Sequence, residues 1–121
     1  MIYSGTALSV ELLPSGTAHL IFDLTGSSVN KFNQKTLSEL QAALTELSSA
    51  RVDGLIFSSA KSAFIVGADI TEFTEMFKQG ESEIMQWLVE GNKLFSTIED
   101  LPFPTVSLID GIALGGGFEL A

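Results

Sequence analysis

The residues best suited to chemistry lie near the end of the chain, where Gly115, Gly116 and Gly117 are followed by Phe118 and Glu119. Successive glycines carry no Cβ atoms, so a ligand can approach the main chain closely. If a helix begins at this turn, its first N–H groups have no partner within the helix, and the helix dipole favours negative charge beside them. Such a turn can stabilise an oxyanion, with Glu119 as the neighbouring acid or base.

The same turn also has a purely structural interpretation, in which the glycines allow tight packing and the helix dipole favours Glu119. Two nucleotide-binding motifs are excluded by spacing. A P-loop continues with Lys and then Ser or Thr, whereas Phe118 and Glu119 follow the last glycine here. The interval between Gly111 and Gly115 does not match the dinucleotide-binding pattern G-x-G-x-x-G.

A second turn of small residues, formed by Gly67, Ala68 and Asp69, follows the apolar residues 64–66. On its own this pattern is typical of a loop or of a helix N-cap. Ligand clefts in α/β proteins tend to form at strand ends. If both turns lie at such ends, each can donate one N–H group to the same carbonyl oxygen, so the pair predicts an oxyanion-binding site.

The elements that would position these turns follow from hydrophobic periodicity. Strands are predicted at residues 7–13, 17–24, 55–58 and 105–109. Helices are predicted at residues 34–48, with Asn33 as N-cap, and 82–99, with a shorter helix ending at Phe77 and capped by Asp69 or Thr71. The first two strands form a hairpin, and the later strand–helix–strand order predicts parallel pairing. The fold class is therefore α/β with a partly parallel sheet, and its last strand is apolar enough to be buried.

Composition narrows the function further. The chain has 121 residues, no cysteine, and 15 acidic against 6 basic residues, for a net charge of −9. This charge argues against a nucleic-acid-binding face, which needs clustered Lys and Arg, and the lack of cysteine excludes thiol catalysis and disulfides. No apolar run reaches the roughly 20 residues of a membrane-spanning helix, and the first residues do not resemble a signal peptide, so a cytoplasmic protein is expected. No group of residues has the spacing of metal ligands, so no metal is expected. The single histidine, His19, is expected to face solvent, and Trp87 with Phe95 is expected to be core.

Taken together, the two turns resemble the paired oxyanion-hole motifs of the enoyl-CoA hydratase/isomerase (crotonase) superfamily. Residues 63–73, AFIVGADITEF, are similar to the first motif, and residues 111–120, GIALGGGFEL, to the second. Residues 28–32, SVNKF, and residues 64–69 are most similar to one family within it, the alpha subunits of bacterial fatty acid oxidation complexes. The resemblance extends over essentially the whole chain.

This resemblance implies a crotonase-type (ClpP/crotonase-like) spiral of ββα units, of which residues 1–121 are the N-terminal portion, truncated at its C-terminal side. By position, the N–H groups of Ala68 and Gly116 would hold the thioester oxygen, and Glu119 would activate water or move a proton. Val66, Ala68 and Asp69 would lie along coenzyme A. The implied function is hydration of 2-trans-enoyl-CoA to 3-hydroxyacyl-CoA in fatty acid β-oxidation, with an enoyl-CoA isomerase side activity.

The resemblance also concerns parts of the protein beyond Ala121. The family's hydratases use a second glutamate, which would lie past this residue, so the chain alone is expected to be inactive. Coenzyme A is carried by the substrate, and the hydratase part needs no other cofactor. The parent would add an NAD-dependent 3-hydroxyacyl-CoA dehydrogenase part and pair with a thiolase (beta) subunit. The alternatives are another acyl-CoA enzyme of the superfamily, an isomerase or a hydrolase, and a non-catalytic acyl-CoA-binding module.

Overall fold

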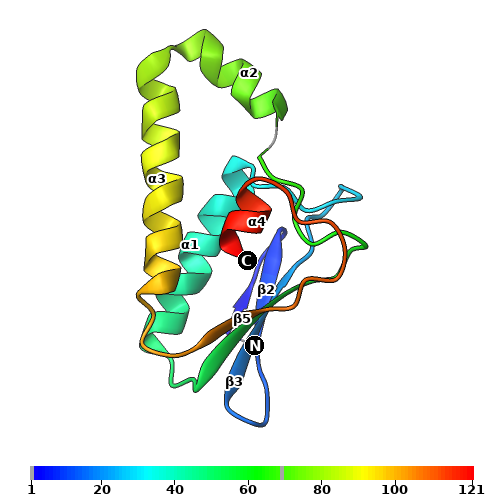
Figure 1. Cartoon of the computed structure of the whole chain (residues 1–121). Coiled ribbons are helices and arrows are strands. Elements are labelled where there is room, and N and C mark those ends of the chain that lie inside the picture. The colour runs from blue at the N-terminus through cyan, green and yellow to red at the C-terminus, as the bar shows by residue number, and fades with distance from the viewer. Residues whose placement is uncertain (1, 69) are drawn as a thin grey trace.

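The computed structural model describes residues 2–68 and 70–121, which form one sheet and several helices (Figure 1). The strands are β1 (Tyr3–Ser4), β2 (Leu8–Leu12), β3 (Thr17–Phe22), β4 (Gly54–Ser59) and β5 (Thr105–Ser107). The helices are α1 (Gln34–Ser49), α2 (Ile70–Gln79), α3 (Glu81–Glu99) and α4 (Gly116–Leu120). In this described part of the chain, no helix is long and apolar enough to cross a membrane.

The sheet is mixed, with the strand order β1-β2-β3-β4-β5. Strands β2 and β3 pair antiparallel as the predicted hairpin. Strands β3, β4 and β5 pair in parallel, and such pairs need long connections. Helix α1 forms the connection from β3 to β4, and helices α2 and α3 form the connection from β4 to β5. The predicted α/β class with a partly parallel sheet is confirmed.

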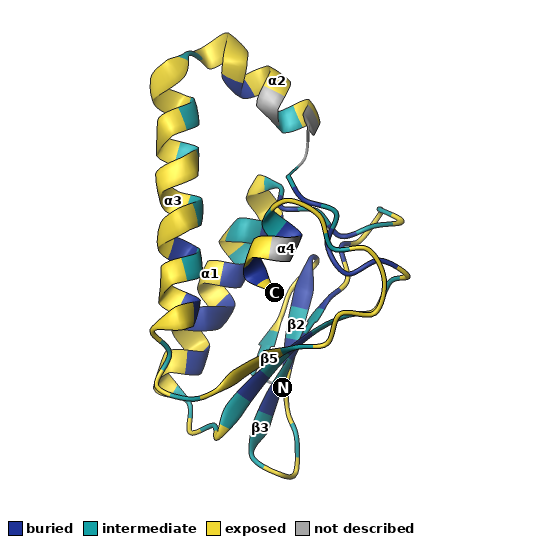
Figure 2. Cartoon of the chain, in the orientation of Figure 1, coloured by how far each residue is buried: buried dark blue, intermediate teal, exposed yellow. Residues whose placement is uncertain are grey.

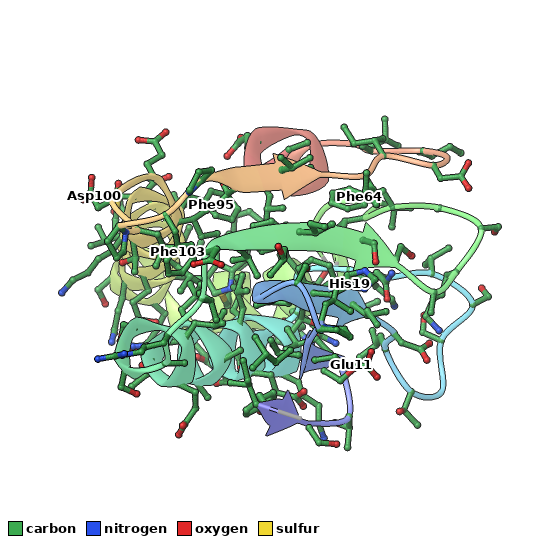
Figure 3. The ribbon with its side chains drawn as sticks, turned by 90° about the horizontal axis from the view of Figure 1, so that it is seen from below. Glu11, His19, Phe64, Phe95, Asp100 and Phe103 are labelled. Carbon is green, nitrogen blue, oxygen red and sulfur yellow. The ribbon has the colours of Figure 1, made fainter. Side chains whose placement is uncertain are left out.

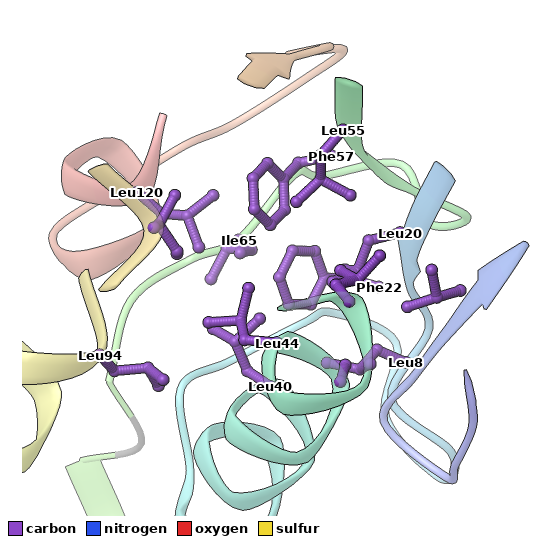
Figure 4. Close-up of a cluster of buried hydrophobic side chains, with 14 of the residues drawn as sticks. Leu8, Leu20, Phe22, Leu40, Leu44, Leu55, Phe57, Ile65, Leu94 and Leu120 are labelled. Atoms are coloured by element: carbon purple, nitrogen blue, oxygen red, sulfur yellow. The ribbon is translucent and has the colours of Figure 1, made fainter. Parts of the chain in front are cut away.

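The main core lies between α1 and one face of the sheet. Alternation along β3 places Ala18, Leu20 and Phe22 on this face, and each is 0% exposed. Leu40 and Leu44 of α1 belong to the same cluster, as Figure 4 shows. Figure 2 shows buried residues along α1 and along the strands, whereas most of α3 is exposed. Full burial of a Leu or Phe side chain stabilises a fold by about 1.5–3 kcal/mol, so this cluster holds α1 on the sheet.

The helix boundaries follow from capping residues. Asn33 has extended dihedral angles, φ −90° and ψ 176°, and its side chain accepts a hydrogen bond from the Thr36 N–H at 2.8 Å. This confirms Asn33 as the N-cap of α1, a role worth about 1 kcal/mol. Gly80, with φ 113°, separates α2 from α3 in a conformation that suits glycine.

Two expectations about the elements are wrong. The strand predicted at residues 105–109 ends at Ser107 and is exposed, with Val106 at 54% and Leu108 at 52%. An apolar run is typical of a strand covered on both faces, but β5 is an edge strand that pairs with β4 alone in the described chain. Thr71 does not cap α2, because this helix begins at Ile70, and Asp69 lies outside the described residues.

The environment of His19 also differs from the expectation. His19 is half-buried, and its Nε2 lies 2.6 Å from the Oγ of Ser58 on β4. Side chains alternate along β3, so His19 points away from the buried Ala18 and Leu20, on the side of the sheet opposite α1 (Figure 3). His19 therefore makes a hydrogen bond across the sheet and does not point freely into solvent.

Glu39 of α1 fastens the turn between β1 and β2. Its carboxylate accepts hydrogen bonds from the N–H groups of Thr6, Ala7 and Leu8 at 3.1, 2.8 and 3.3 Å. The Thr6 hydroxyl donates to it at 2.8 Å. Burial raises the pKa of Glu39, but these hydrogen bonds to the charged form outweigh burial, so the pKa lies below its usual value of 4.5.

We expect Glu39→Gln to loosen this turn, because an amide has a single acceptor oxygen and no charge. Hydrogen exchange at the Ala7 amide should show an opening free energy lower by about 1–2 kcal/mol at pH 7. Because the folded pKa is lowered, the contribution of the carboxylate is complete above pH 4.5 and is lost as the pH falls through the folded value. The difference between wild type and variant should therefore shrink in acid, and a difference that stayed constant with pH would contradict this account.

Candidate functional site

The glycine turn and the loop that follows β4 lie side by side. Ile65 and Ala113 form a parallel bridge, and the Leu114 N–H donates to the Ile65 carbonyl at 3.0 Å. Beyond this bridge Gly67 lies against the second turn, since a Cβ on Gly67 would be 3.2 Å from the Leu114 carbonyl oxygen and 3.9 Å from the Gly115 Cα. The structure therefore brings together the two turns that sequence analysis singled out.

The peptide group between Gly67 and Ala68 supplies the first N–H group. The Gly67 carbonyl accepts a hydrogen bond from the Phe32 N–H at 2.8 Å. In a planar trans peptide the C=O and N–H bonds point in opposite directions, so the Ala68 N–H points away from the main chain of Phe32. Among residues 2–68 and 70–121, no acceptor takes the Ala68 N–H. An N–H group in this state is available to a ligand.

The start of α4 supplies the second N–H group. Gly115 is the N-cap, with φ 51° and ψ −121°, and its carbonyl accepts from the Glu119 N–H at 3.0 Å. By the same peptide geometry, the Gly116 N–H points away from the helix, beyond its N-terminus. No acceptor in the described part of the chain takes this N–H. The predicted helix start at the glycine turn is thus confirmed.

Both N–H groups belong to residues that line one cavity of about 230 Å³. Glu119 lines the same cavity and is exposed, in the single turn of α4. Chemically, two main-chain donors and one carboxylate can polarise a carbonyl oxygen and move a proton beside it. The structure therefore groups Ala68, Gly116 and Glu119, the three residues predicted for the reaction.

The remaining wall of this cavity is largely apolar. It is formed by Phe32, Leu37, Trp87, Leu88, Gly91, Asn92 and Phe95. The rings of Phe32 and Phe95 meet edge to face, with centroids 5.6 Å apart. Trp87 and Phe95, which were expected to be core, are half-buried and line the cavity, and Phe95 also packs against the core cluster.

Of the three residues predicted to lie along coenzyme A, the structure describes Val66 and Ala68. Val66 is half-buried, and its N–H donates to the Asn30 carbonyl at 3.0 Å. Ala68 lines the cavity, whereas Asp69 lies outside the described residues. Their contacts with coenzyme A stay predictions.

Sequence reasoning missed Asn30, which is 1% exposed. Its side-chain amide makes several hydrogen bonds, one of them to residues 64–68, the loop that leads to Ala68 and is called the cavity loop below. Asn after a Gly–Ser segment is typical of a surface loop, so the residue type gave no sign of burial. Its position within SVNKF, next to Phe32, was the only available signal.

Comparison with known proteins identifies the family of the chain. A family profile described as "Enoyl-CoA hydratase/isomerase" matches residues 22–121. The chain is 54% identical over 121 residues to the fatty acid oxidation complex subunit alpha of Pseudomonas entomophila, and 50% identical over 121 residues to that of Acinetobacter baylyi. Each alignment covers 99% of this chain and 17% of the relative, so the chain spans about a sixth of the length of these curated relatives. The resemblance to alpha subunits is confirmed.

Solved structures of enoyl-CoA hydratases have the same fold as this chain. An enoyl-CoA hydratase from Shewanella pealeana superposes with a TM-score of 0.86 at 25% identity, over 94% of this chain and 43% of that one. An enoyl-CoA hydratase from Bacillus anthracis superposes with a TM-score of 0.83 at 28% identity, again over 94% of this chain and 43% of that one. These likenesses confirm the crotonase-type fold. The family profile covers most of the length of the chain, residues 22–121. The chain therefore belongs to the enoyl-CoA hydratase/isomerase family.

Proposed function

We propose that the protein carrying this chain adds water to 2-trans-enoyl-CoA to give 3-hydroxyacyl-CoA, with enoyl-CoA isomerisation as a side activity. The observation that carries this proposal is the single cavity shared by Ala68, Gly116 and Glu119. Two N–H groups with no acceptor among the described residues, next to a carboxylate, are the groups this reaction requires. The names of the relatives support a place in fatty acid β-oxidation.

In the proposed mechanism, the thioester oxygen accepts hydrogen bonds from the N–H groups of Ala68 and Gly116. Glu119 takes a proton from water as the water oxygen bonds to C3. The electron pair of the C2=C3 double bond moves toward the thioester, whose oxygen gains negative charge, and an acid then protonates C2. That acid is expected to be the second glutamate, beyond Ala121. Loss of one oxyanion donor lowers kcat about 10²–10³-fold in comparable sites, so the two donors are a major contribution to the rate.

The apolar wall of the cavity fits the acyl part of such a substrate. Phe32, Leu37 and Phe95 offer carbon surface beside the donors, and burial of an acyl chain there would exclude water from the thioester. With less water, the hydrogen bonds to the developing charge strengthen. This arrangement favours an acyl thioester over a small polar substrate.

For the whole protein, the proposal extends to a multifunctional cytoplasmic enzyme in which residues 1–121 are the N-terminal portion of the hydratase domain. Coenzyme A would enter with the substrate and lie along Val66, Ala68 and Asp69. An NAD-dependent dehydrogenase part and a thiolase subunit as partner would complete the sequence of reactions. Support comes from the relatives, which are subunits of fatty acid oxidation complexes.

We expect Glu119→Gln in the complete protein to remove most hydratase activity while leaving enoyl-CoA binding largely intact. The amide keeps the shape of the side chain but cannot accept a proton from water. Removing a general base lowers the rate about 10²–10⁴-fold, which steady-state hydration of crotonyl-CoA would show. Turnover near the wild-type rate would exclude Glu119 from the mechanism.

The donor role of Gly116 is tested by comparing Gly116→Pro with Gly116→Ala. Gly116 is the first residue of α4, a position that accepts proline, and both variants add a Cβ that would lie 2.9 Å from the Phe32 Cδ2. Only proline removes the N–H. We expect kcat to be about 10²–10³-fold lower in Gly116→Pro than in Gly116→Ala, with circular dichroism confirming that both fold. Equal kcat values in the two folded variants would rule out this donor.

We also expect residues 1–121 alone to show no hydratase turnover and to fold marginally. Helix α4 has five residues, too few to be stable without packing, and apolar residues of the β5 segment stay exposed, including Val106, Leu108 and Ile109. The test is crotonyl-CoA hydration together with thermal unfolding of the isolated chain. Cooperative unfolding with measurable turnover would contradict both parts.

A further inference from the structure

Asn30 lies between β3 and α1, and its amide is buried among main-chain groups at the end of β3 and after β4, together with the Ser59 hydroxyl. Its Oδ1 accepts from the Leu24 N–H at 3.0 Å, just after β3. Its Nδ2 lies 3.2 Å from the Phe22 carbonyl, 3.0 Å from the Phe64 carbonyl and 2.8 Å from the Ser59 Oγ. An N–H can only donate and a carbonyl can only accept, so these partners define which way the amide faces.

The main chain of residues 30–32 forms hydrogen bonds that position the cavity loop. The Asn30 carbonyl accepts from the Val66 N–H at 3.0 Å, and the Phe32 N–H donates to the Gly67 carbonyl at 2.8 Å. The second bond belongs to an isolated parallel bridge between Phe32 and Ala68. The direction of the Gly67–Ala68 peptide therefore depends on where residues 30–32 lie, and the Asn30 side chain anchors that segment.

We propose that Asn30 is a positioning residue that aims the Ala68 N–H into the cavity. This inference rests on the proposed function, because it gives the Ala68 N–H the role of an oxyanion donor. The second donor, Gly116, takes its direction from the start of α4, and neither of these two hydrogen bonds holds it, although it packs against the Phe32 ring. Loss of the Asn30 amide should thus misdirect the Ala68 N–H more than the Gly116 N–H.

The test is Asn30→Asp in the complete protein, with Glu39→Gln as the matched control. Aspartate keeps the shape and the acceptor for Leu24, but it sets a carboxylate oxygen against the carbonyls of Phe22 and Phe64. Glu39→Gln also weakens a side-chain anchor of main-chain N–H groups, but at the β1–β2 turn. Two readouts apply: kcat and KM with crotonyl-CoA, and the infrared C=O stretch of bound carbonyl-labelled butyryl-CoA.

We expect Asn30→Asp to lower kcat roughly 10- to 100-fold with little change in KM, because small misplacements of a catalytic group cost this much. Binding should lower the C=O stretching frequency of butyryl-CoA less in this variant than in wild type. The control should keep both the wild-type kcat and the full frequency shift. A merely structural role for Asn30 would change thermal stability without changing the shift seen in the folded variant.

The outcomes separate the two proposals. A folded Asn30→Asp variant with the wild-type kcat and frequency shift overturns the positioning role, and so does an equal loss in Glu39→Gln. A wild-type protein that neither hydrates crotonyl-CoA nor lowers the stretch overturns the proposed function itself. If Asn30→Asp does not fold, Ser59→Ala removes one partner of the amide, and a smaller change in the same direction supports the role, whereas no change overturns it.

Discussion

The direction of one peptide group decides whether the cavity has its first hydrogen-bond donor. The Gly67 carbonyl is held by the Phe32 N–H at 2.8 Å, so peptide planarity turns the Ala68 N–H the opposite way. Gly67 reaches this geometry with φ 105°, which a residue with a Cβ adopts only under strain. The parallel strands, α1 and the buried amide of Asn30 all act on the site by fixing where Phe32 and Gly67 lie.

In the glycine turn, different glycines serve packing and leave an N–H group available to a ligand. A Cβ on Gly117 would run into the Ile65 carbonyl, so that position is glycine for packing. Gly116 lies against the Phe32 ring and carries the N–H with no acceptor in the described residues. Close packing of α4 on the loop is therefore what brings the second donor to the cavity, and Leu120 in the core anchors the helix there.

Phe32 connects the core of the fold to the wall of the cavity. Its ring meets Phe22 of β3 edge to face at 6.3 Å and Phe95 of α3 at 5.6 Å. Its main-chain N–H orients the Gly67 carbonyl, and its ring limits the space beside Gly116. Packing changes in the sheet core can thus reach both donors through one residue, since close-packed interiors transmit small displacements.

Local patterns in the sequence determined the hairpin, the Asn33 cap, the helices and the two small-residue turns, because periodicity, capping and glycine conformation act over a few neighbouring residues. The paired motifs were also enough to identify the family and to name Ala68, Gly116 and Glu119 as candidates. Burial was decided only by the tertiary structure: Val106, Leu108 and Ile109 at the sheet edge are apolar yet exposed, Asn30 is polar yet buried, and Trp87 lines a cavity. Whether a side chain is covered, or an N–H finds an acceptor, depends on segments distant in sequence. No local pattern contains that information, and only the folded arrangement of residues 30–32, 65–68 and 113–117 supplies it.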